Sequence, residues 1–80
     1  MEPPPGWKTE GKALVRVYDR GDFDGSIAFV NAVAAVANRL DHHPEIALSW
    51  SRVTVTTWSH DKGGITERDV ALAREIDAIA

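Results

Sequence analysis

Hydrophobic and polar side chains alternate along four short stretches of the chain, which is the pattern of β-strands with one buried face. Residues 7–9 and 13–18 flank a Glu-Gly-Lys turn and predict a first hairpin. Residues 46–50 and 53–58 are rich in β-branched and aromatic side chains and predict a second hairpin. Residues 1–6 include three consecutive prolines, so we expect an extended leader at the start of the chain.

Two further stretches repeat their apolar residues at helical spacing. The first begins at Asp22, the expected N-cap, and runs to about Leu40, because Pro44 disfavours helical geometry at the residue before it. Its expected core-facing stripe consists of Phe23, Ile27, Val30, Ala34 and Ala37, widened by Val33, Val36 and Leu40. The second helix is predicted to follow Thr66, which forms an approximate capping box with Asp69.

The order of these elements is strand, strand, helix, strand, strand, helix. This order favours an α+β fold of two layers, with an antiparallel four-stranded sheet and both helices on one face. Eighty residues with 44% hydrophobic content suffice for one core but not for two, so residues 1–80 are predicted to form a single domain. Because so small a domain buries a modest share of its surface, pairing with another copy is expected.

Charge and composition exclude several classes of function. The chain has 12 acidic and 9 basic residues, a net charge of −3 and no basic stripe, so direct nucleic-acid binding is not expected. The absence of cysteine excludes disulfides, thiol nucleophiles and zinc sites that use cysteine. No stretch approaches the roughly 18 apolar residues of a membrane span, and the start of the chain lacks a signal-peptide pattern. We therefore predict a cytoplasmic location without membrane contact.

All three histidines of the chain, His42, His43 and His60, lie within nineteen positions. A strand over residues 53–58 that packs under the first helix would bring His60 back beside His42. Imidazole both donates and accepts protons near neutral pH, because its unperturbed pKa is roughly 6.5. Two imidazoles on opposite sides of a substrate form an acid/base pair.

Other interpretations of these residues stay open from composition alone. Surface histidines at the end of a helix can interact with the negative end of its dipole. Three histidines can also hold a catalytic zinc, although adjacent histidines rarely both face one metal and no HExxH helix is present. Trp50 and Trp58 have the shape to stack on a flat heterocycle, but aromatic strand residues more often belong to the core.

The same segments resemble a known family. They are Asp41-His42-His43-Pro44-Glu45, Trp50, Trp58-Ser59-His60-Asp61 and Gly64-Ile65-Thr66-Glu67-Arg68-Asp69. In residue type and spacing they resemble the pterin-4a-carbinolamine dehydratases. Pro5-Gly6-Trp7 and the first helix also look like that family, so the resemblance covers nearly the whole chain.

The resemblance implies a cytoplasmic hydro-lyase that dehydrates 4a-hydroxytetrahydrobiopterin to the quinonoid dihydropterin during tetrahydrobiopterin recycling. It implies a small-molecule pterin substrate, a homodimer or homotetramer, and catalysis without a metal or an organic cofactor. The catalytic residues that it implies are His42, His43 and His60.

By the same resemblance, His42 and His60 exchange protons with the substrate, and which of them is the acid stays open. His43 holds and orients the pterin. Three further positions are expected to line the pocket: Asp41, Trp58 and Ser59. Asp69, which we also place among the substrate-binding residues, either orients a histidine or caps the second helix.

One departure from the family pattern concerns Asn38, where the family usually has a charged residue, often glutamate. An amide can form hydrogen bonds but carries no charge, so we expect reduced or altered activity. The alternative function is a non-catalytic binding or assembly module, because relatives of the family include a dimerisation partner of a transcription factor and assembly chaperones. Retention of the three histidines favours catalysis.

Overall fold

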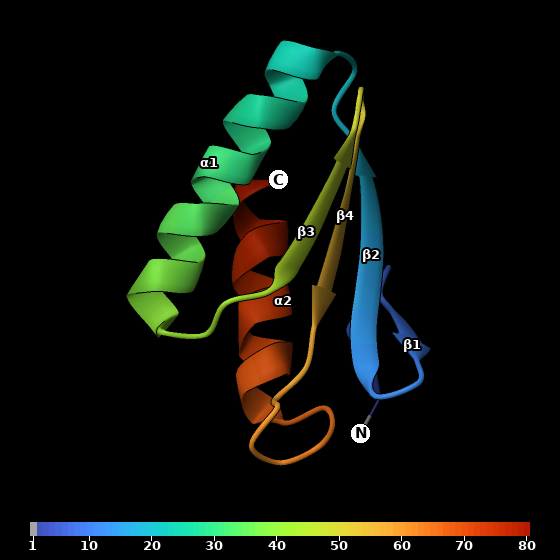
Figure 1. The fold of residues 1–80 in the computed structure, drawn as a ribbon, viewed down its shortest axis with the longest axis vertical. Helices are drawn as coiled ribbons and strands as arrows, with labels where there is room; N and C mark the ends of the chain where they lie inside the picture. Colours follow the sequence, from blue (N-terminus) through green and yellow to red (C-terminus); the bar gives the residue numbers. More distant parts are fainter. Residues whose placement is uncertain (1) are drawn as a thin grey trace.

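Two β-hairpins alternate with two helices along the chain (Figure 1). The computed structural model describes residues 2–80. The elements are β1 (Lys8–Glu10), β2 (Ala13–Asp19), α1 (Phe23–Leu40), β3 (Glu45–Ser49), β4 (Arg52–Thr57) and α2 (Glu67–Ile79). The strands form one antiparallel sheet in the order β1-β2-β4-β3, and both helices lie on the same side of it. The predicted α+β fold is thus confirmed.

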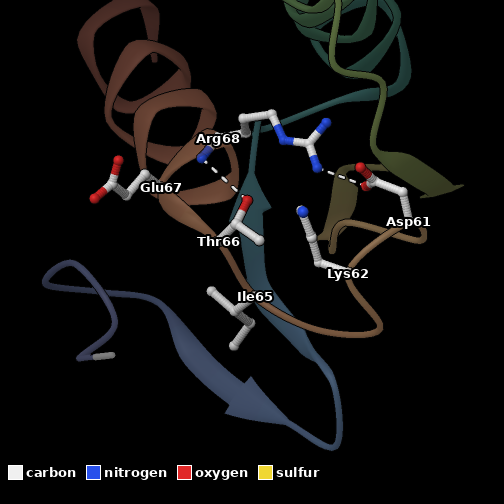
Figure 2. Close-up of a pocket in the computed structure, with 6 residues that line it drawn as sticks. All are labelled: Asp61, Lys62, Ile65, Thr66, Glu67 and Arg68. Carbon is white, nitrogen blue, oxygen red and sulfur yellow. Dashed lines mark hydrogen bonds and ion pairs between the residues drawn. The ribbon is translucent and has the colours of Figure 1, made fainter.

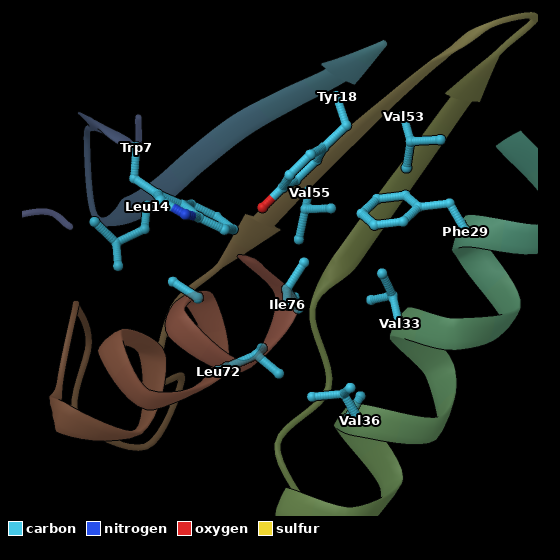
Figure 3. Packing of buried hydrophobic residues seen from close by; sticks show 12 residues of the cluster. Trp7, Leu14, Tyr18, Phe29, Val33, Val36, Val53, Val55, Leu72 and Ile76 are labelled. Carbon is cyan, nitrogen blue, oxygen red and sulfur yellow. The ribbon is translucent and has the colours of Figure 1, made fainter. Parts of the chain in front are cut away.

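A single cluster of buried side chains fills the space between the sheet and the helices (Figure 3). Successive strand residues point to opposite faces, so Val53 and Val55 of β4 both enter the core and are fully buried. Leu14 and Tyr18 do the same from the neighbouring strand β2. From the helices, the buried apolar residues are Phe29, Val33, Val36, Ala37, Leu72, Ala73 and Ile76. Within residues 2–80, no helix combines the length and apolarity needed to cross a membrane.

Helix α1 begins as predicted but presents a different face to the core. The Asp22 side chain accepts a hydrogen bond from the Gly25 amide at 2.7 Å, so Asp22 is the N-cap. The expected stripe is wrong in its first members, because Phe23 is 51% exposed and Ile27 is 40% exposed. The residues that α1 buries are Ser26, Phe29, Val33, Val36 and Ala37. Because apolar residues cover more than one side of this helix, periodicity alone did not select the correct side.

The hairpin of β3 and β4 also differs from its prediction. β3 ends at Ser49, and Trp50 lies in the connecting turn with a positive φ of 53° and 75% exposure. The turn sits at the end of the hairpin opposite to the residues that precede β3 and follow β4. Trp50 is therefore neither a core residue nor near the histidines.

The N-terminal leader was predicted to be extended, and the structure adds a turn at its end. The Trp7 amide donates to the Pro4 carbonyl at 3.0 Å and closes a turn in which Gly6 has a φ of 87°. A Cβ at Gly6 would lie 2.3 Å from the guanidinium of Arg16, so glycine fits both the backbone and the space. The first residue of the predicted leader, Met1, lies outside the described residues.

Asp77 near the end of α2 joins this N-terminal turn to the sheet. Its carboxylate accepts hydrogen bonds from the Trp7 indole, the Arg16 guanidinium and the Tyr18 hydroxyl. Burial and the hydrogen bond to Asp77 together raise the pKa of Tyr18 above its ordinary value. The network fixes the N-terminal turn at one end of α2, which leaves the other end of that helix to the histidines.

Candidate active site

The chain reverses direction sharply between α1 and β3, and this turn presents two histidines. Asp41 ends α1 in the left-handed conformation, with a φ of 52°. The His42 amide then bonds back to the Ala37 carbonyl at 3.1 Å, which satisfies one of the last free carbonyls of the helix. His42 and His43 are thereby held beyond the end of the helix rather than on its side. Asp41 itself is exposed and lies outside the lining of the hollow described below, and its contact with a substrate stays a prediction.

The third histidine arrives from the other strand of the same hairpin. Glu45 at the start of β3 pairs with Thr56 near the end of β4, so the segments before and after the hairpin meet at one edge of the sheet. Trp58 and His60 follow β4, and their rings stack with centroids 3.8 Å apart.

A surface hollow of about 380 Å³ joins these side chains, and we call it the histidine hollow. Its lining consists of His42, His43, Trp58, His60, Asp61 and Arg68. The three histidines converge on this hollow as predicted, and Trp58 lines it with them. Their catalytic role remains a prediction. Asp61 and Arg68 were not predicted as site residues, although both belong to the segments that carry the family resemblance.

A buried carboxylate stands directly behind His42. The Nε2 atom of His42 lies 2.6 Å from Oδ1 of Asp69, whose side chain is fully buried. Burial alone would raise the pKa of Asp69, but hydrogen bonds from Thr57, His42, the Thr66 amide and Ser59 outweigh it and hold the pKa below its ordinary value. Asp69 is therefore ionised at neutral pH and can only accept.

This ionised acceptor fixes the tautomer of His42. The proton shared with Asp69 lies on Nε2, which leaves Nδ1 of the neutral ring with a free lone pair. A carboxylate in this position also stabilises the positive ring that forms when Nδ1 takes up a proton. His42 is thus arranged to accept a proton at a known atom.

Ser59 and Asp69, which we expected to contact the substrate, are both buried behind the histidine hollow. Asp69 instead performs both of the roles that were left open for it. It completes the capping box of α2 by accepting from the Thr66 amide at 2.8 Å, and it binds His42. Ser59 donates to Asp69 at 2.8 Å and so supports the carboxylate rather than the ligand.

His43 has a neutral partner. Its Nε2 atom lies 2.9 Å from Oδ1 of Asn38, which lies in the last turn of α1. The amide oxygen accepts from the ring, so Asn38 orients His43 without adding a negative charge to the site. The two adjacent histidines therefore differ in the charge behind them.

A second hollow of about 570 Å³ adjoins the first at the start of α2 (Figure 2). Its lining residues are Asp61, Lys62, Ile65, Thr66, Glu67 and Arg68. Asp61 and Arg68 line both hollows, and their ion pair of 2.5 Å lies between them. The hydrogen bond from Arg68 lowers the pKa of Asp61. This lining holds two acidic and two basic residues, so its formal charges balance.

The zinc interpretation finds no support in this geometry. Among residues 2–80, no three histidine, aspartate or glutamate side chains are grouped as metal ligands would be. His42 and His43 are directed to separate partners, Asp69 and Asn38.

Comparisons with known proteins identify the family of the chain. The family model described as pterin 4 alpha carbinolamine dehydratase matches residues 1–79. A protein of Thermosynechococcus vestitus that is named for pterin-4-alpha-carbinolamine dehydratase is 47% identical over 76 residues, which cover 95% of this chain and 80% of that protein. A protein of the same name from Metallosphaera sedula is 42% identical over 73 residues, which cover 91% of this chain and 76% of that protein.

Two solved structures share the fold. A transcriptional coactivator/pterin dehydratase from Brucella melitensis superposes with a TM-score of 0.89 at 37% identity, over 95% of this chain and 83% of that one. A pterin dehydratase-like protein identified as a RuBisCO assembly factor in the alpha-carboxysome has a TM-score of 0.75 at 24% identity, over 92% of this chain and 86% of that one. Because the family model spans almost the entire sequence and the relatives exceed 40% identity over most of it, the chain belongs to the pterin 4 alpha carbinolamine dehydratase family.

Proposed function

We propose that this protein is a hydro-lyase that removes water from a 4a-hydroxytetrahydropterin. The observation that carries the proposal is the convergence of three histidines on one hollow, with His42 held by a buried, ionised carboxylate. The names of the similar proteins support the same reaction class. We further propose that the reaction belongs to tetrahydrobiopterin recycling in the cytoplasm.

The chemistry needs one acid and one base. In a carbinolamine the hydroxyl group and the nitrogen are bound to the same carbon, so dehydration breaks the C–O bond and forms a C=N bond. The hydroxyl group must gain a proton to leave as water, and the ring nitrogen must lose its proton. Proton transfer by positioned side chains accelerates such steps by about 10²–10⁴-fold.

We assign the base to His42 and the acid to His60. Nδ1 of His42 takes the proton from the ring nitrogen, and the Asp69 carboxylate stabilises the resulting positive charge. His60, stacked on Trp58, donates a proton to the departing hydroxyl group. His43 orients the pterin from its position on Asn38. Exchange with solvent returns both catalytic histidines to their starting states.

The test is stopped-flow absorbance of 4a-hydroxytetrahydropterin disappearance at pH 7 to 8.5, with circular dichroism of each variant to verify folding. We expect His42→Ala and His60→Ala to lose acceleration over buffer. His43→Ala serves as the comparison and is expected to raise KM more than it lowers kcat. Full turnover in both His42→Ala and His60→Ala would contradict the proposal.

A second candidate is protein binding, because α1 leaves an apolar strip uncovered. Phe23 and Ile27 lie one turn apart on its surface and are both largely exposed. Pairing of this strip with a second copy would remove it from water and supports a homo-oligomer. Sedimentation velocity of the wild type and of Phe23→Ser/Ile27→Ser tests this. A wild-type protein that sediments as a monomer at high concentration would exclude the oligomer.

A further inference from the structure

Thr57 occupies a core-facing position of β4, and the other two core-facing positions of that strand are valines. Val53, Val55 and Thr57 share the core-facing side of β4, and all three are almost completely buried. A buried hydroxyl group costs free energy unless it finds a partner. The Thr57 hydroxyl donates to Oδ1 of Asp69 at 2.6 Å, so its one strong contact is with the carboxylate behind His42.

The two oxygens of Asp69 have separate sets of donors. Oδ2 accepts from the Ser59 hydroxyl and from the Thr66 amide, both at 2.8 Å. Oδ1 accepts from His42 and from Thr57, both at 2.6 Å. The Oδ2 donors belong to the capping box and its loop, whereas Thr57 is the donor that the sheet supplies to the oxygen bound by His42.

From this arrangement we infer that Thr57 is a positioning residue for His42. Its hydroxyl fixes the rotation of the Asp69 carboxylate, so that Oδ1 stays in line with Nε2 of His42. This inference rests on the proposed role of His42 in proton transfer. It adds a residue that touches neither the hollow nor the substrate.

Removal of the hydroxyl group has a specific consequence. In Thr57→Val the shape of the side chain is kept, but Oδ1 retains only one of its two donors. The carboxylate then gains rotational freedom, and Nδ1 of His42 spends less time in the productive orientation. Because the lining of the hollow is unchanged, the loss falls on kcat and not on KM.

The chain offers a matched control and a rescue. Thr56→Val makes the same change one residue earlier, on the opposite face of β4. Thr57→Ser keeps the hydroxyl group and removes only a methyl group. We expect about a tenfold loss of kcat in Thr57→Val, with KM within about twofold of the wild type. Thr56→Val should match the wild type, and Thr57→Ser should recover most of the lost kcat.

A spectroscopic measurement separates this inference from the proposed function. Two-bond ¹H–¹⁵N correlations of the histidine rings report the tautomer of His42 without any substrate. We expect the Nε2–H tautomer in both proteins, because Asp69 can only accept. In Thr57→Val we expect a weaker hydrogen bond to Asp69, seen as a shifted and broadened Nε2–H signal of His42. If His42→Ala kept full activity, the proposed function would fail while this measurement would still decide the role of Thr57. An unchanged His42 signal in Thr57→Val, or equal kcat losses in Thr57→Val and Thr57→Ser, would overturn the inference.

Discussion

Replacement of Asp69 by asparagine converts one oxygen of the buried carboxylate into a donor, and the surroundings decide which one. The Thr66 amide points at Oδ2 and can only donate, so the remaining oxygen of the asparagine must stay at that position. The NH₂ group is therefore forced to the Oδ1 position, where it faces His42 and Thr57. The Thr57 hydroxyl can rotate to accept, and His42 can accept only at an unprotonated Nε2. Asp69→Asn thus forces the opposite tautomer, with the proton on Nδ1.

Asp69→Asn should affect the activity of the protein far more than its stability. Every hydrogen bond of the site can still form, and the buried charge is lost, so we expect the free energy of unfolding to fall by only about 1–2 kcal/mol. A domain of 80 residues has a total of about 4–12 kcal/mol, so it should remain folded. Activity should fall far more, by about 10²–10⁴-fold in kcat, because the atom that accepts the proton is now protonated.

Stopped-flow kinetics and ring NMR measure these effects on the same samples. Asp77→Asn is the matched control, because it makes the same change on the same helix at the network of the N-terminal turn. It should lower the melting temperature and leave kcat unchanged. If Asp69→Asn folded normally and retained kcat within threefold of the wild type, the assignment of Nδ1 of His42 as the base would be wrong.

Three further predictions follow from the charges and hydrogen bonds of the molecule. Asp77→Ala leaves three donors without their acceptor and should lower the free energy of unfolding by about 3 kcal/mol, or the melting temperature by more than 10 °C. Glu75→Ala breaks only an exposed ion pair and should lower the free energy of unfolding by under about 1 kcal/mol. Equal losses of the two variants in thermal unfolding would contradict this. Because the pKa of Asp69 is lowered on folding, its contribution to stability is complete above about pH 4 and is lost as the pH falls through its native pKa. In urea unfolding, the difference in free energy of unfolding between wild type and Asp69→Asn should therefore shrink below about pH 4, and a constant difference would contradict this. Asn38→Leu removes the partner of His43 and should raise KM several-fold with little change in kcat, and a selective loss of kcat in steady-state kinetics would argue that His43 acts in the chemical step.

The element order could be predicted because each element carries a strong local signal. The N-cap at Asp22 and the capping box at Thr66 were found from residue type and spacing. The buried side of α1 could not be found in this way, because its apolar residues extend around more than one side and tertiary packing makes the choice. The turn at Trp50 was missed for a related reason, since a tryptophan with positive φ has no local signature.

The convergence of the histidines with Trp58 was predictable, but the other lining residues and the contacts behind the hollow were not. The histidines were found because they are few and clustered. The burial of Ser59 and Asp69 depends on how the loop after β4 folds back onto the start of α2, through the Ser59–Gly64 pairing. Thr57 and Asp77 were missed because each looks ordinary in its element, as a strand threonine and a helix aspartate. Their partners are distant in the sequence: Asp69 is 12 residues from Thr57, and Trp7 is 70 residues from Asp77.

Helix α2 carries the two carboxylates that organise opposite ends of the molecule, and their separation makes their effects independent. Asp69 and Asp77 are eight residues apart, or about 12 Å along the helix. Sites farther apart than about 7–10 Å without shared partners usually have additive effects on stability. The donors of Asp69 come from β4, the loop after it and the His42 turn, whereas those of Asp77 come from β2 and the N-terminal turn. In the double variant Asp69→Asn/Asp77→Asn, the loss of unfolding free energy should therefore equal the sum of the losses in the two single variants. Its kcat should equal that of Asp69→Asn alone. The reason is that one end of the helix holds the histidine site and the other end holds the N-terminal turn.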